Sequence, residues 1–375
     1  MRRWRVYATA ALLVPALVVP ASATLVRGPY LQRLTRRFVT VVWNTGAAAA
    51  CSLAIRHGNA VPRIVAGPTG TVCGIDVGGL DPDTLYQYVP RADGVPLGEE
   101  ASFRTDGTSG PFTFQVLGDS GCGCASQLVV RDQMLASPAD FILHTGDMIY
   151  QKILRPEDFD GQIFDVYGPL MRRMVLWPTL GNHDRKRDDG AIWRDVFFTP
   201  ANNPAQVKDY YSFDYGNAHV VVLDSTTSTG RNSDQYRFLD RDLAASGATW
   251  KFVVFHHTLY SSGKHGGATK IRRNLTPLFD QHGVTVVFMG HDHNYERTKP
   301  LRDGQIVGAG QGTTYVTTGG GGKSIRPVGT SDFTAYSESA FHFTRVTVDQ
   351  DQVRLEMVRA DGAVRDHCLL PRRES

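Results

Sequence analysis

The sequence lacks the signatures of several common enzyme classes. It contains no Gly-x-Ser-x-Gly segment, so it does not carry the nucleophile elbow of the serine hydrolases. Gly322-Lys323-Ser324 looks like the end of a phosphate-binding loop, but Thr317 stands where the first glycine of that loop must be. There is no long-period repeat, and low complexity is confined to the glycine run 319–322.

Long hydrophobic runs and excess charge are also missing from most of the chain. The basic start with Arg2, Arg3 and Arg5, the apolar run 8–19 and Ala21-Ser22-Ala23 predict a secretory signal peptide over residues 1–23. Without its three arginines the formal net charge falls from +3 to 0, which gives no reason to expect a nucleic-acid-binding patch. No later apolar stretch reaches transmembrane length, so we expect a secreted or periplasmic protein without a membrane span.

Cysteine is scarce, with five residues in 375. Export would place them in a compartment that permits disulfides, and Cys51 with Cys73 is the first pair we expect. Of Cys122, Cys124 and Cys368, one must stay unpaired or bond outside the chain. Cys122 and Cys124 directly follow the polar segment 118–121 and could themselves bind a metal, but a structural disulfide is the better interpretation.

The remaining chain divides into two patterns. Residues 24–106 read as short strands, two of them over 38–43 and 52–55, separated by glycine and proline turns, which predicts a β-sandwich. Residues 105–111 are rich in small and turn-forming residues and predict a hinge. Residues 112–370 alternate between mostly apolar strands, among them 112–117 and 141–144, and segments with helical spacing, which predicts an α/β domain. A chain of this length can hold both.

Five short polar segments follow predicted strands of the second domain. They are 118–121 (Gly-Asp-Ser-Gly), 146–150 (Gly-Asp-Met-Ile-Tyr), 181–184 (Gly-Asn-His-Asp), 253–256 (Val-Val-Phe-His) and 290–293 (Gly-His-Asp-His). Ligands of α/β folds gather at the C-terminal ends of strands. Oxygen ligands combined with imidazole point to a pair of first-row transition metals, an arrangement used in phosphate ester hydrolysis.

These five segments resemble, without a gap, the pattern of the purple acid phosphatases within the calcineurin-like metallophosphoesterases. The last segment extends to Gly-His-Asp-His-Asn-Tyr-Glu-Arg, close to the form found in that family. The resemblance implies a fibronectin type III-like module over 24–106. For 112–370 it implies an α/β sandwich with two central mixed sheets flanked by helices.

The resemblance also implies the ligand set, in which Asp147 bridges both metals. It assigns Asp119, Tyr150 and His293 to the first metal and Asn182, His256 and His291 to the second. Tyr150 favours Fe(III) in the first site, because a phenol with a free pKa of about 10 loses its proton more easily to a trivalent ion. The second metal is then divalent Zn, Fe or Mn.

The expected reaction is attack of a metal-held hydroxide on phosphorus, with His183 assisting the leaving group. Asp184 is predicted to orient the His183 imidazole or raise its pKa. His265 is the predicted second histidine at the substrate, although His257 competes with it. His257 could also replace His256 as a metal ligand.

The sequence therefore predicts a phosphatase acting on small phosphate monoesters. A phosphodiesterase acting on nucleotides or phospholipid head groups is the alternative, because both reactions use the same metals. A secreted binding protein that keeps metals only for stability is a third hypothesis. The oligomeric state is not encoded in these patterns.

Overall fold

The computed structural model describes residues 23–107, 110–186 and 188–373. The predicted signal peptide lies, apart from Ala23, outside the described residues, and so does part of the predicted hinge. None of the helices in the described ranges is both long and apolar enough to cross a membrane.

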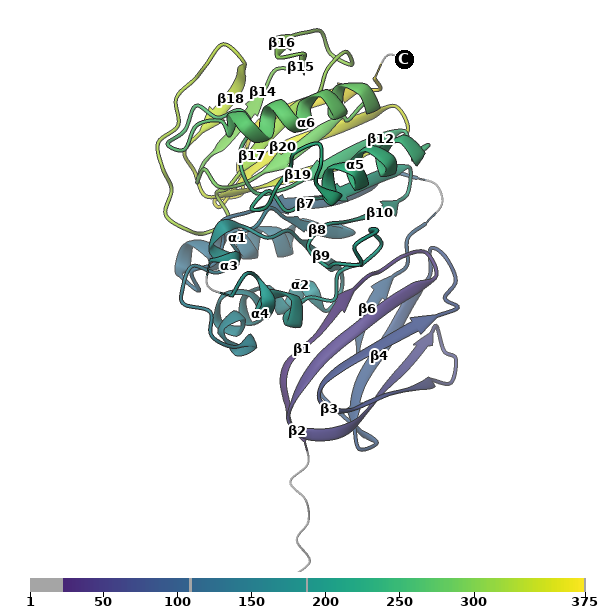
Figure 1. Ribbon diagram of the computed structural model, residues 1–375. Coiled ribbons are helices and arrows are strands. Elements are labelled where there is room, and N and C mark those ends of the chain that lie inside the picture. Colours follow the sequence, from purple (N-terminus) through teal and green to yellow (C-terminus); the bar gives the residue numbers. More distant parts are fainter. Residues whose placement is uncertain (1–22, 108–109, 187, 374–375) are drawn as a thin grey trace, which may run out of the picture.

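The N-terminal region is all β, and its strands fold over one another as a sandwich (Figure 1). The two strands predicted around Trp43 and Leu53 are halves of one long strand, whose register shifts between Asn44 and Ala49. Cys51 and Cys73 form the expected disulfide in its core. Its strands are β1 (Leu25–Gln32), β2 (Phe38–His57), β3 (Arg63–Gly78), β4 (Leu85–Ala92), β5 (Val95–Pro96) and β6 (Ala101–Arg104).

The second region has two sheets, and the first is central to the site. Its order is β21-β20-β19-β7-β8-β9, with β7, β8 and β9 parallel and β19 antiparallel to β7. The predicted strands 112–117 and 141–144 match β7 and β8 residue for residue. The bounds are β7 (Phe112–Leu117), β8 (Phe141–His144), β9 (Val175–Pro178), β19 (His342–Val348), β20 (Gln352–Arg359) and β21 (Val364–Pro371).

The second sheet has the order β10-β11-β12-β13-β17-β14-β18, and β11, β12, β13 and β17 run parallel. A short hairpin of β15 and β16 stands apart from it. The bounds are β10 (Tyr211–Tyr215), β11 (Ala218–Val222), β12 (Trp250–Val254), β13 (Val286–Met289), β14 (Tyr295–Thr298), β15 (Leu301–Arg302), β16 (Gln305–Ile306), β17 (Thr314–Thr318) and β18 (Thr334–Glu338).

Aromatic side chains join the two sheets face to face. The Phe114 ring of β7 lies 5.3 Å from the Phe252 ring of β12 and 5.9 Å from the Phe288 ring of β13. Such pairs contribute roughly 0.5–1.5 kcal/mol each beyond the area they bury. The two sheets therefore share a single buried core, which holds the ends of their strands in fixed positions relative to each other.

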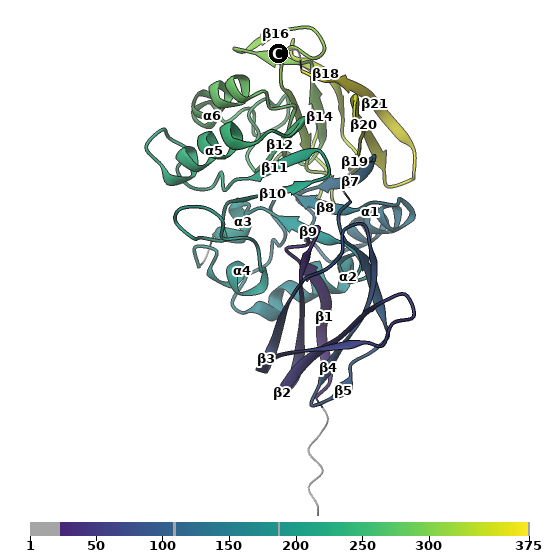
Figure 2. The ribbon, with the colours of Figure 1, turned by 90° about the vertical axis from the view of Figure 1, so that its right-hand side faces the viewer.

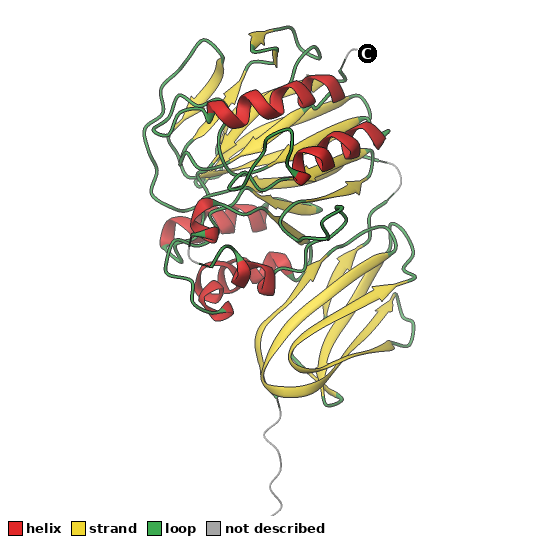
Figure 3. Cartoon of the chain, in the orientation of Figure 1, coloured by secondary structure: helices red, strands yellow, loops and turns green. Residues whose placement is uncertain are grey.

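Helices cover the outer faces of both sheets (Figure 3). In α6, Leu275, Leu278 and Phe279 face the core at helical spacing, and the helix ends at Gly283 with a left-handed φ of 70°. The helices are α1 (Ala125–Ala136), η1 (Pro156–Phe159), η2 (Asp160–Phe164), α2 (Asp165–Met171), α3 (Asn182–Arg185), α4 (Ala191–Val196), α5 (Asp234–Ala245) and α6 (Thr269–His282).

The sandwich packs against the lower helices of the α/β region (Figure 2). The buried Tyr30 hydroxyl donates to the Val196 carbonyl at 2.8 Å, and the Tyr88 hydroxyl donates to the Arg172 carbonyl at 2.8 Å. Arg27 forms an ion pair with Asp160 across the same boundary. These buried contacts fix the two regions relative to each other.

Candidate metal centre

The polar segments predicted from the sequence come together at one edge of the two sheets. Asp119 follows β7, Asp147 and Tyr150 follow β8, and Asn182 begins α3 after β9. His256 follows β12 of the other sheet, and His291 and His293 follow β13. Because β7, β8 and β9 are parallel, as are β12 and β13, the C-terminal ends in each sheet point to one edge.

The backbone of this edge is unusual. Asp119, Asp147 and His291 have positive φ values of 55°, 54° and 69°. This left-handed region costs a side-chain-bearing residue roughly 1–2 kcal/mol, and such residues concentrate at functional sites. Gly181 is needed for close approach, because a Cβ there would lie 2.2 Å from both the backbone nitrogen and Oδ1 of Asp147.

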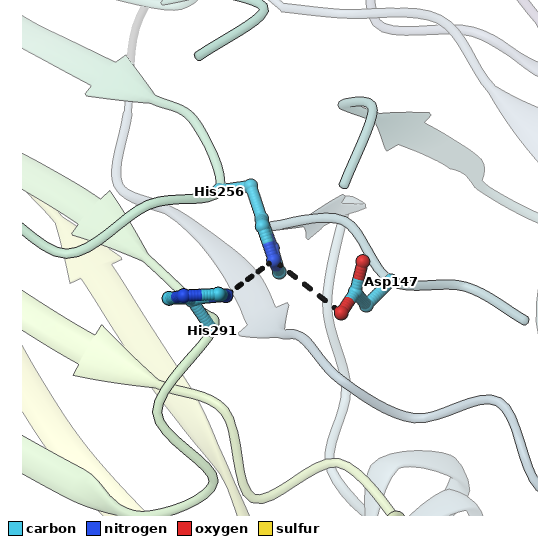
Figure 4. Close-up of side chains that lie close together, drawn as sticks. All are labelled: Asp147, His256 and His291. Atoms are coloured by element: carbon cyan, nitrogen blue, oxygen red, sulfur yellow. Dashed lines mark hydrogen bonds and ion pairs between the residues drawn. The ribbon is translucent and has the colours of Figure 1, made fainter. Parts of the chain in front are cut away.

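One group of donors surrounds His256, which is fully buried (Figure 4). Its Nδ1–H donates to the Thr145 carbonyl at 2.9 Å, so Nε2 carries the lone pair whenever the imidazole is neutral. That Nε2 lies 3.0 Å from Asn182 Oδ1, 3.2 Å from His291 Nδ1 and 3.4 Å from Asp147 Oδ2. Donor atoms of Asp147, His256 and His291 all lie within 4.8 Å of one another, as a shared metal ion requires.

A second group surrounds Tyr150. Its hydroxyl lies 3.1 Å from Asp119 Oδ1 and 3.0 Å from His293 Nε2. His293 Nδ1–H donates to the Ser324 carbonyl at 2.8 Å, so Nε2 carries the lone pair here as well. In both groups a backbone carbonyl fixes the imidazole tautomer, which is how proteins orient histidine ligands.

Burial and close charges shift the acidities of these groups. Burial raises the pKa of Asp119 to about 8, and Asp147 adds to the rise. Burial would also raise the pKa of Asp147, but the adjacent His256 holds it below its usual range. Burial alone would lower the pKa of His256, whereas Asp147 raises it to about 10. Burial raises the pKa of Tyr150 well above its usual value.

This donor set fits two metal ions. Carboxylate, phenol, amide and imidazole atoms converge in two neighbouring groups. The Asp147 carboxylate lies beside the His256 group, and the Asp147 backbone nitrogen lies next to Gly181. Buried carboxylates are costly without a positive charge, and metal ions supply that charge. Asp119, Tyr150 and His293 can hold one ion, and Asn182, His256 and His291 the other.

His183 lies at the rim of this cluster. Its ring centroid is 4.4 Å from that of Tyr150, and its Nε2 is 4.0 Å from Asp147 Oδ2. The His183 side chain is 35% exposed, so a substrate can reach it. Burial lowers the pKa of His183, while Asp147 opposes that shift.

The Asp184 carboxylate is taken up by backbone hydrogen bonds. This fully buried group accepts backbone N–H bonds from Met148 and Gly181, both at 2.8 Å, and from Ile149 at 3.2 Å. Among the described residues it makes no hydrogen bond to the His183 imidazole. Asp184 points inward from the start of α3, so it braces the loop that carries Asp147 instead of orienting its neighbour.

His257 and His265 both lie near the donor group around His256. The His265 ring centroid is 4.2 Å from that of His291, and the His257 centroid is 4.7 Å from it. His257 Nδ1 is hydrogen-bonded to Ser225 Oγ at 2.9 Å, whereas His265 is exposed on its loop. His256, not His257, therefore lies among the donor atoms, and His265 is more exposed than His257.

Comparison with known proteins agrees with this geometry. The calcineurin-like phosphoesterase family matches residues 112–295, and the iron/zinc purple acid phosphatase-like protein C family matches residues 312–367. Purple acid phosphatase 21 of Arabidopsis thaliana is 32% identical over 275 residues, which cover 68% of this chain and 59% of that relative. The chain belongs to the purple acid phosphatase family.

Other members support the assignment. Purple acid phosphatase 18 of Arabidopsis thaliana is 30% identical over 266 residues, covering 66% of this chain and 57% of that relative. The chain thus spans less than two thirds of the length of these two relatives. The purple acid phosphatase PPD1 from yellow lupin seeds shares the fold, with a TM-score of 0.81, 22% identity and coverage of 94% of this chain and 74% of that one.

The sequence did not reveal how the glycine run 319–322 serves the site. A Cβ at Gly319 would lie 2.2 Å from the Asp292 carbonyl oxygen, and one at Gly321 would lie 2.5 Å from the Gly118 carbonyl oxygen. The run lets a loop pass directly over the family's metal-ligand segments. The glycine content of the run is the sequence signal for this close approach, although it also fits a stretch of low complexity. The same neighbourhood contains the Cys122–Cys124 disulfide, while Cys368 is a free thiol.

Proposed function

We propose that the protein is a binuclear metal-dependent phosphatase that hydrolyses monoesters of small molecules. Fe(III) would be held by Asp119, Tyr150 and His293, and divalent Zn, Fe or Mn by Asn182, His256 and His291, with Asp147 between them. The observation that carries the proposal is the convergence of donor lone pairs on shared points, described above for His256 and His293. Such an arrangement is repulsive unless cations occupy it.

When bound, the two metal ions would supply positive charge to the phosphate oxygens and make a water molecule acidic enough to attack phosphorus. Residues of the chain would protonate the leaving group and help to bind the phosphate. His183 is half-exposed beside Asp147, and its Nε2 would give a proton to the departing alkoxide. The exposed His265, stacked on His291, would hold the phosphate from the other side.

The surrounding protein supports export and a two-domain organisation. The disulfides Cys51–Cys73 and Cys122–Cys124 favour an oxidising compartment, which agrees with the predicted signal peptide over 1–23. We propose residues 24–106 as a fibronectin type III-like module and residues 112–370 as the catalytic domain. The β-sandwich contributes none of the proposed metal ligands.

The test combines metal analysis, the visible spectrum and turnover of an aryl phosphate. We expect two metal ions per chain, a broad visible band that Tyr150→Phe removes, and turnover that His183→Ala strongly lowers. The control is His367→Ala, because His367 is exposed on β21 and outside the metal-ligand segments. Unchanged turnover in both Asn182→Ala and His183→Ala would refute the catalytic assignment. Turnover of diesters alone would favour the phosphodiesterase hypothesis.

A further inference from the structure

The loop that follows β17 is fastened to the metal-ligand segments through its backbone. Gly321 N–H donates to the Gly118 carbonyl and Lys323 N–H to the Asp119 carbonyl, both at 3.0 Å. Arg326 N–H donates to the His293 carbonyl at 2.9 Å. The Ser126 hydroxyl donates to the Gly322 carbonyl at 2.6 Å. The loop therefore has a fixed position relative to both donor groups.

This loop places two cationic side chains just outside the proposed ligands. Lys323 Nζ lies 4.8 Å from the centre of the Tyr150 ring. The Arg326 guanidinium donates to His265 Nε2, and the His265 ring stacks on His291 with 4.2 Å between centroids. Lys323 thus contacts Tyr150 of one donor group. Arg326 contacts His265, which lies between Arg326 and His291 of the other donor group.

Neither cation is paired with a carboxylate in the described part of the chain. Within the described ranges, no carboxylate oxygen lies within 4.0 Å of Lys323 or Arg326, whereas arginines elsewhere, such as Arg297 with Asp366, are paired. Both side chains are only half-buried, so a ligand can reach them. Two cations held at one rim of a site by a braced loop attract anions to that rim.

The position of these cations decides which part of a substrate they meet. In the proposed function the reacting phosphate is bound by the metal ions, His183 and His265. Lys323 contacts Tyr150 and Arg326 contacts His265, two residues that border the proposed phosphate site, so both cations can meet the part of a substrate beyond its reacting phosphate. Charge-assisted hydrogen bonds from lysine and arginine favour carboxylate and phosphate oxygens.

We propose that Lys323 and Arg326 form a subsite for a second anionic group of the substrate. The preferred substrates would be small phosphate monoesters that carry a carboxylate or a second phosphate close to the ester oxygen. This inference rests on the proposed phosphatase function and adds a substrate class to it. The Tyr150 and His265 rings lie between the subsite and the proposed metal ions.

The experiment compares three related esters with the metal-loaded enzyme. Glycerol 2-phosphate has no second anion, 2-phosphoglycerate adds a carboxylate, and 2,3-bisphosphoglycerate adds a carboxylate and a phosphate. The quantity measured is the ratio of kcat/KM for each anionic ester to that for glycerol 2-phosphate. The variants are Lys323→Gln, Arg326→Gln and their combination, with Lys323→Arg and Arg326→Lys as charge-preserving variants. Arg36→Gln removes an exposed cation of the sandwich and serves as the control.

We expect the wild-type ratio to exceed one and to fall about fivefold to tenfold in the double variant, the loss of one or two charge-assisted bonds. The charge-preserving variants should retain most of the ratio, and the control should not change it. Preference for the bisphosphate over 2-phosphoglycerate would identify phosphate as the second group, and equality would identify carboxylate. An unchanged ratio, or an equal loss for all three esters, would overturn the subsite. No turnover of any ester by the wild type would instead overturn the proposed function.

Discussion

Replacing Asp184 with asparagine tests whether this residue braces the metal-binding loop or serves its neighbour His183. The Asp184 carboxylate accepts three backbone N–H bonds, from Met148, Ile149 and Gly181, in a fully buried place. Asparagine has nearly the same shape but only one acceptor oxygen. Its amide nitrogen must therefore face a backbone N–H, which leaves two buried donors opposed.

The magnitude follows from those bonds. An unsatisfied buried donor costs about 1–3 kcal/mol, and bonds to a carboxylate are about twice as strong as neutral ones. Part of the loss is offset, because burial and the nearby Asp147 raise the pKa of Asp184 to about 7, so the carboxylate is itself costly to keep charged. We expect a net destabilisation of about 2–3 kcal/mol, or roughly 4–12 °C in Tm for a domain of this size.

The assay is a double-mutant cycle with turnover, Tm and metal content as readouts. If Asp184 acts through the loop, Asp184→Asn lowers Tm and metal content equally in wild-type and His183→Ala backgrounds. Asp188→Asn is the control, because Asp188 also accepts two backbone N–H bonds, from Gly190 and Ile192, outside the proposed ligand set. The reasoning would be refuted if the variant kept its Tm and metal content and lost its effect on turnover once His183 was absent.

Two further predictions concern stability and close packing. The pKa of His219, which burial would lower, is raised to about 9 by the two carboxylates that flank it. Because the folded-state value exceeds the unfolded one, this stabilisation is complete below pH 6.5 and disappears as the pH rises through 9. In denaturant titrations His219→Gln should cost up to about 3 kcal/mol at pH 6 and little at pH 10, and an equal cost at both would contradict this. Gly181→Ala should abolish metal binding, measured by elemental analysis, because its Cβ would lie 2.2 Å from the Asp147 carboxylate, whereas Gly247→Ala meets no atom within 4 Å and should bind normally.

The strand positions, and which side chains gather at the candidate site, could be predicted from the sequence because both depend on local patterns. The apolar runs 112–117 and 141–144 are bounded by polar or turn-forming residues, and the structure has strands with those limits. A polar residue directly after a buried parallel strand must lie at the sheet edge, so Asp119 and Asp147 follow from the strand prediction itself. Known residues of the family supplied the rest of the ligand set.

The sequence was a poor guide to side-chain contacts where a contact joins distant parts of the chain. Asp184 neighbours His183 in sequence, but the first turn of a short helix sends the two side chains in different directions. Its true partners include N–H groups 35 and 36 residues away, which no local pattern encodes. The glycine run 319–322 was similarly ambiguous, because only the folded structure shows that the chain passes over Gly118 and Asp292 there.

The geometry of the site also implies that metal binding and folding are linked. Three proposed ligands hold positive φ values at roughly 1–2 kcal/mol each, and Asp119 is a buried carboxylate whose pKa is raised to about 8 by burial. The metal-free protein carries these costs without compensation. A ligand that binds only the folded state adds about 2.7 kcal/mol at a hundredfold excess over its Kd.

Removing the metals with a chelator should therefore lower Tm by several degrees, and adding iron with zinc should restore it. Losses should be confined to the α/β region, because the sandwich contributes none of the proposed ligands. Hydrogen exchange should accordingly increase in the segments 118–121, 146–150 and 290–293 and stay constant in β2. Asn182→Ala, which lacks one ligand, should show a smaller response to the chelator. A chelated protein with unchanged Tm and unchanged exchange would mean that the strained loops are held by packing alone, and that these donors do not bind metal with useful affinity.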